Sequence, residues 1–173
     1  MESKIKLFGH PIHPMLVVFP LGLFATGVLF DILYLIGGDP TLPNVSYYLI
    51  GAGLVGGAIA AVFGIIDWLG LPYNSRAWNI GLMHGIGNVF ILALFLLSWL
   101  RRGRDLIPDT TILAVSLSAI ALAMVMAWIG GELVYRLGVS VDRGANINAP
   151  NSLTHESASG TVTSSRTEPT LHG

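Results

Sequence analysis

Long apolar runs are the feature that most restricts what this chain can fold into. Several stretches of about twenty mainly apolar residues follow one another, and such runs are typical of helices that cross a bilayer. Charged residues make up only 11% of the sequence, against about 25% in soluble domains. The predicted fold is therefore all-α, an integral membrane four-helix bundle. Its predicted spans lie at about 14–36, 45–69, 79–100 and 110–137.

The chain divides by composition into a membrane domain and a polar tail. Residues 1–142 are predicted to form the four-helix transmembrane domain. Residues 143–173 are predicted to be disordered, because they contain too few large apolar side chains to offset the entropy of ordering. Within the first span, Pro20 removes a backbone hydrogen bond and predicts a kink. In the second span, Gly53 and Gly57 are spaced for close helix packing in lipid.

Basic residues near the span ends favour one orientation. With four spans, both termini and the middle loop share one side of the membrane. The basic residues on that side are Lys4, Lys6, Arg76, Arg136 and Arg143, and those on the other side are Arg101, Arg102 and Arg104. The excess predicts a multi-pass protein of the cell (plasma) membrane with both termini in the cytoplasm.

The polar residues of the spans gather at one face of the membrane. Alternate helices run in opposite directions, so the start of the first and third spans lies level with the end of the second and fourth. The residues that fall on this face are His10, His13, Asp67, His84, Asn88, Glu132 and Arg136. Ionisable groups are costly in lipid and tend to face a bundle interior or a site. Glu132 and Arg136, four residues apart, are expected to form an internal ion pair.

Three histidines are candidate ligands within this cluster. His10 and His13 belong to a Gly-His-Pro-Ile-His-Pro string that is predicted to form a helical first turn with both rings on one side. Together with His84 they could hold a transition metal, or one of them could pair with His84 on a single haem. Alternatively they could cap a helix or lie at the headgroup level, with no cofactor at all. Glycines at 81 and 85 could clear space for a porphyrin or simply allow tight helix packing.

Four strings in the chain resemble one family of bacterial membrane proteins. They are GHPIHPMLVVFPLGLF at the start, FGIIDWL at 63–69, GLMHGIGN at 81–88 and GGELVYRLGV at 130–139. The family is the four-span one filed as domain of unknown function 2231, and the resemblance covers about residues 5–142. It implies that the characteristic polar residues are His10, His13, Asp67, His84, Glu132 and Arg136.

The resemblance also bears on electron transfer. Some relatives carry a Rieske-type iron–sulfur domain after the membrane part, which implies a redox role. This chain has no cysteine, so any such role would depend on a separate redox partner protein or a quinone. The family is also distantly similar to four-helix b-type cytochromes, which implies one haem at most here.

Three hypotheses for function follow. The first is a membrane redox component that binds one b-type haem or a histidine-bound metal, with Glu132 and Arg136 supporting the ligands. The second is an assembly or anchoring subunit without cofactor, and the third is proton or ion transport through Asp67, His84 and Glu132. The sequence shows no hydrolase or transferase motif, so a stand-alone enzyme is not expected. The net charge of −1 gives no field for nucleic acid. The expected partner is the lipid bilayer, and a homo-oligomer is possible.

Overall fold

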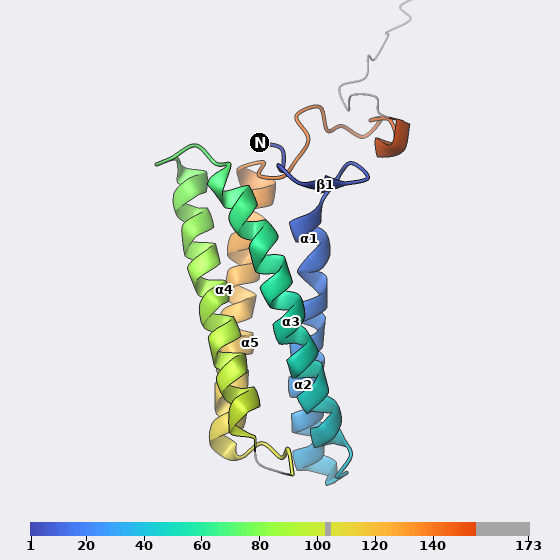
Figure 1. Cartoon of the computed structure of the whole chain (residues 1–173), viewed down its shortest axis with the longest axis vertical. Helices are drawn as coiled ribbons and strands as arrows, with labels where there is room; N and C mark the ends of the chain where they lie inside the picture. The colour runs from blue at the N-terminus through green and yellow to red at the C-terminus, as the bar shows by residue number, and fades with distance from the viewer. Residues whose placement is uncertain (103–104, 155–173) are drawn as a thin grey trace, which may run out of the picture.

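The computed structural model describes residues 1–102 and 105–154, which form a bundle of long helices. Figure 1 shows the helices side by side, with successive spans running in opposite directions. Each is long and apolar enough to cross a membrane. The four spans are Ile12–Gly37, Leu42–Leu69, Arg76–Arg101 and Thr110–Arg136. The predicted all-α four-helix membrane fold is confirmed.

The first span consists of two helices, α1 (Ile12–Leu16) and α2 (Val18–Gly37). They are separated at Val17, three residues before Pro20. Proline has no N–H to donate, and its ring crowds the carbonyl four residues earlier, which here belongs to Leu16. The predicted kink at Pro20 therefore takes the form of a break one turn earlier.

The remaining spans begin at recognisable sequence signals. Helix α3 (Leu42–Leu69) has a proline in its first turn. Helix α4 (Arg76–Arg101) begins after Ser75, whose hydroxyl accepts the N–H of Trp78 at 3.1 Å. Helix α5 (Thr110–Gly131) is capped in the same way by Asp109. The fourth span ends in a π-helical turn, η1 (Glu132–Arg136), where backbone hydrogen bonds link residues five apart.

The chain before α1 forms a hairpin rather than a helical turn. Strands β1 (Lys6–Leu7) and β2 (His10–Pro11) pair antiparallel, and the tip residues Phe8 and Gly9 both have positive φ. Positive φ at both tip positions is the geometry of a type I′ turn, which suits Gly9 but strains Phe8. The prediction that His10 and His13 share a helical first turn is wrong, because the helix begins at Ile12.

The first part of the polar tail lies against this hairpin. Residues 143–154 run through turns to a short 3-10 helix, η2 (Ser152–Thr154), and Ser152 lies beside Gly9 and His10. The predicted disorder of residues 155–173 concerns a segment outside the described residues.

The centre of the bundle is an apolar layer that depends on small residues. The rings of Phe24 and Phe95 stack with centroids 4.0 Å apart. A Cβ at Gly53 would lie 2.7 Å from the Phe24 ring, and one at Gly57 would lie 2.6 Å from Leu92. The pair of glycines predicted to allow close packing is therefore what lets α3 approach α2 and α4.

A buried ion pair lies at the opposite end of the bundle from the N-terminus. Arg102, just after α4, donates to both carboxylate oxygens of Asp31 in α2, at 2.9 Å and 2.5 Å. Both side chains have no exposed surface. Sequence reasoning treated Arg102 as a surface charge, which is wrong. The signal that could have found the pair is Asp31 itself, since an acidic residue inside a span needs a nearby cation.

Candidate functional site

The candidate site lies at the end of the bundle that holds the N-terminus, the loop between α3 and α4, and the end of η1. These three segments lie at the same end in Figure 1. The shared face predicted for His13, Asp67, His84, Glu132 and Arg136 follows from this arrangement. Their individual contacts separate residues that support the fold from residues that keep a free ligand atom.

His13 points from α1 into the interface with α3. Its Nδ1 lies 2.8 Å from the carbonyl oxygen of Ala60. A carbonyl can only accept, so this contact assigns the proton to Nδ1 and leaves Nε2 with a lone pair in the neutral ring. The ring lies over Gly64, where a Cβ would come within 2.8 Å of Cε1. Glycine at position 64 is thus what makes room for the imidazole.

His84 repeats this arrangement between α4 and α5. Its Nδ1 lies 3.0 Å from the carbonyl oxygen of Met126, and its ring faces Gly130, where a Cβ would lie 3.1 Å from Cε1. The Nε2 atom again keeps its lone pair. Both rings lie at helix interfaces, His13 between α1 and α3 and His84 between α4 and α5.

His10 does not join the other two histidines. It is exposed on the hairpin, and its Nε2 lies 3.3 Å from the Ser152 hydroxyl. Within residues 1–102 and 105–154, no three histidine or acidic side chains are grouped so as to hold a metal ion. Of the three candidate ligands, the structure therefore brings His13 and His84 into the bundle and leaves His10 outside it.

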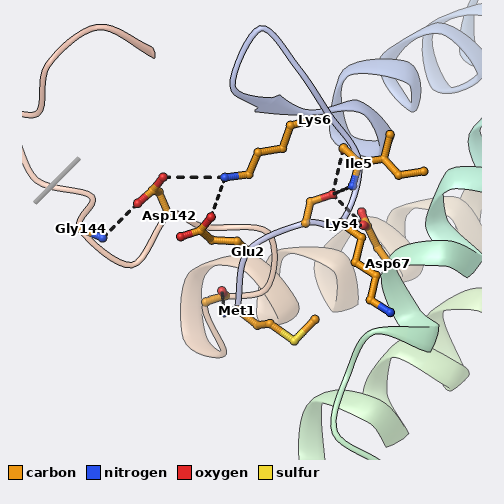
Figure 2. A network of polar contacts seen from close by, with 10 residues as sticks. Met1, Glu2, Lys4, Ile5, Lys6, Asp67, Asp142 and Gly144 are labelled. Carbon is orange, nitrogen blue, oxygen red and sulfur yellow. Dashed lines mark hydrogen bonds and ion pairs between the residues drawn. The ribbon is translucent and has the colours of Figure 1, made fainter. Parts of the chain in front are cut away.

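Asp67 holds the N-terminal segment onto the bundle. The buried carboxylate, near the end of α3, lies 2.6 Å from the Ser3 hydroxyl and 3.3 Å from the backbone nitrogen of Lys4. Figure 2 shows Asp67 pointing toward this segment rather than toward a neighbouring helix. Its observed role is thus to fasten the chain that precedes α1.

The same segment also reaches the end of the fourth span. The backbone N–H of Ser140 donates to the Met1 carbonyl at 2.7 Å, and the Lys6 ammonium lies between Glu2 and Asp142 (Figure 2). The hydrogen bond from Lys6, followed by its charge, holds the pKa of Glu2 below its usual value. The ion pair between Lys6 and Glu2 is therefore present at neutral pH, and it is lost as the pH falls through the lowered pKa of Glu2. We call residues 1–11 the N-terminal cap.

Glu132 pairs with a residue that the sequence did not suggest. Its carboxylate lies 2.5 Å from the Arg76 guanidinium of α4, and the predicted pair with Arg136 is not formed. The reason is the π-turn, which links residues five apart, so that residues four apart no longer stack on one face. Among the described residues, Arg136 has no hydrogen-bonding or ionic partner.

The residues around His84 are mostly occupied by protein contacts. The Asn88 side chain donates to the His84 carbonyl at 2.8 Å, one turn earlier in the same helix. The space at Gly81 is filled by the Trp68 ring and that at Gly87 by Met126, whereas Gly85 has no neighbour within 4 Å. Trp68 in turn donates its indole N–H to the Trp78 carbonyl. Gly85 is exposed, so the open space beside it faces the outside of the bundle.

The fold and the site define a four-span membrane protein with a polar, capped end. Residues 9–143 match the family described as "Predicted membrane protein (DUF2231)", and the chain belongs to that family. No curated protein and no solved structure matches the chain.

Proposed function

We propose that this membrane protein holds one redox-active metal centre, with His13 and His84 as the protein ligands. The centre is either a b-type haem or a transition-metal ion that takes its other ligands from outside the protein. When bound, it would supply one-electron chemistry at the capped end of the bundle.

The observation that carries the proposal is the matched pair of histidine contacts. A histidine that ligates a metal almost always donates its other ring N–H to a carbonyl or carboxylate, which fixes the tautomer and the ring orientation. His13 and His84 both do this, with Ala60 and Met126. Their Nε2 atoms have no protein partner among the described residues.

The packing around His84 bears differently on a bound metal ion and on a bound haem. A metal ion requires the Nε2 atoms and small ligands, so it is compatible with Trp68 and Met126 where they lie. A haem requires a flat space, which the positions beside Gly81 and Gly87 do not offer, and the open position at Gly85 faces the outside of the bundle. In either form, an electron would be exchanged with a membrane quinone or a redox partner at this end.

Transport receives less support from the same contacts. Asp67 and Glu132 are already bonded to Ser3 and Arg76. Toward the centre of the bundle, the stacked rings of Phe24 and Phe95 belong to a cluster of buried apolar side chains.

The orientation in the cell membrane is part of the proposal. With Arg102 buried against Asp31, the far side of the membrane keeps fewer basic residues near its span ends than the capped side. The excess favours the capped end in the cytoplasm.

The test is a reduced-minus-oxidised absorbance spectrum of the purified full-length protein, with metal analysis of the same sample. We expect sharp haem bands or a stoichiometric metal. His13→Ala and His84→Ala should each abolish the signal, because each removes a ligand. His10→Ala is the matched control and should keep it.

Neither haem nor metal, in protein from cells supplied with both, would refute the proposal and leave an assembly or anchoring role. Loss of the signal in His10→Ala would show that the hairpin histidine is a ligand and that the pair named here is wrong.

A further inference from the structure

An open groove runs along the outer face of the fourth span, at the capped end of the bundle. It has a volume of about 370 Å³. Its lining residues come from the last turns of α5 and from η1: Ala127, Trp128, Gly131, Glu132, Tyr135 and Arg136. Gly131 contributes no side chain to this lining.

The groove contains one cation that the fold does not use. Arg136 is exposed and has no ionic partner among the described residues, because the π-turn moves it away from Glu132. The Glu132 carboxylate is neutralised by Arg76. The three groups together therefore carry one net positive charge, located on Arg136.

Two aromatic side chains flank this charge. Trp128 is 73% exposed and Tyr135 is 88% exposed. Aromatic rings of this kind lie at the boundary between hydrocarbon and headgroups, where one end of the ring is apolar and the other is wet. Arg136 is at the end of the same span, so its guanidinium lies at the level of lipid phosphates.

We propose that this groove binds the headgroup of an anionic phospholipid from the leaflet at the capped end. The Arg136 guanidinium donates to the phosphodiester, and the rings of Trp128 and Tyr135 contact the glycerol and the upper acyl chain. A guanidinium suits this ligand because its planar fork can donate two hydrogen bonds to one phosphate. The proposal does not depend on a metal at His13 and His84.

Native mass spectrometry of the delipidated full-length protein in detergent tests the site. Phosphatidylglycerol and phosphatidylcholine are titrated as the anionic and zwitterionic probes. We expect phosphatidylglycerol to bind at lower concentration. Arg136→Gln should raise the concentration for half occupancy by about fivefold, the factor for one basic residue at a lipid surface. Arg101→Gln removes the same charge from an exposed arginine at the other end, and should change nothing.

A second variant and a competitor complete the design. Trp128→Ala keeps the charge and should also weaken phosphatidylglycerol binding, because it removes the ring beside the headgroup. Excess inorganic phosphate should not displace the lipid, since a free phosphate makes no contact with the rings. Equal effects of Arg136→Gln and Arg101→Gln would overturn the proposal in favour of general charge attraction. Displacement by phosphate, or unchanged binding in Trp128→Ala, would overturn it as well.

Discussion

Replacing Asp31 with asparagine leaves the Arg102 guanidinium buried without its carboxylate. The pair consists of two charge-assisted hydrogen bonds, at 2.9 Å and 2.5 Å, between side chains with no exposed surface. Breaking a buried ion pair by removing one partner costs about 3–5 kcal/mol, most of it from the charge left behind. Because Arg102 lies just beyond the end of α4, its long side chain can turn toward the headgroups after the substitution. We therefore expect a loss near the lower value, about 3 kcal/mol, or more than a hundredfold in the folding equilibrium.

The assay is reversible unfolding in mixed micelles, followed by tryptophan fluorescence. Trp99 is a local reporter, since its ring stacks on Tyr47 at the same end of the bundle. A double-mutant cycle with Arg102→Met measures the coupling, and the double variant should recover much of the loss because no charge remains buried.

Asp39→Asn is the matched control, because it makes the same chemical change at an exposed aspartate that bonds only its own turn through Thr41. If Asp31→Asn is no less stable than Asp39→Asn, or if the cycle shows no coupling, then water reaches the pair and the reasoning fails.

Three further predictions concern the packing, the cap and the orientation. Gly53→Ala should destabilise the bundle by about 1–3 kcal/mol in the same assay, because its Cβ would lie 2.7 Å from the Phe24 ring. Gly22→Ala, with no atom within 4 Å, should be tolerated. Asp67→Ala should speed amide hydrogen exchange in residues 1–11, since it removes the acceptor for the Lys4 N–H. A topology reporter fused to either terminus should show that this terminus lies in the cytoplasm.

Each of these predictions has an outcome that contradicts it. Equal stability of the two glycine variants would show that the stacked rings move aside without cost. Unchanged exchange after Asp67→Ala would mean that the contacts of Lys6 and Met1 hold the cap by themselves. A reporter signal from the outer side of the membrane would show that the orientation is the opposite of the proposed one.

The spans and their shared polar end could be predicted because they depend on hydropathy and on alternating direction alone. Helix rotation could not be predicted, and rotation decides that His84 faces Met126 and that Glu132 faces Arg76. The pairing of Glu132 with Arg136 failed because α-helical spacing was applied to a segment that forms a π-turn.

Arg102 and His10 illustrate two other limits of sequence reasoning. An arginine after an apolar run is usually a surface charge, and only its long-range partner Asp31 shows otherwise. The string around His10 has prolines that suit a helix start, but the positive φ at Phe8 and Gly9 turns the chain into a hairpin before the helix begins. Gly9 suits this turn but Phe8 does not, so local residue preferences do not decide between the two.

The N-terminal cap sets an order of events during synthesis of the protein. Residues 1–11 leave the ribosome before the four spans, yet their contacts with Ser140 and Asp142 have to wait until the fourth span has been made. Until then the cap is held by its hydrogen bonds to Asp67 and by the packing of Met1 and Lys4 beside Gly70. Throughout that interval the end of the bundle with His13 and His84 is more open to water than in the finished protein. Under the proposed function, His84 is oriented as a ligand only once the fourth span has supplied the Met126 carbonyl.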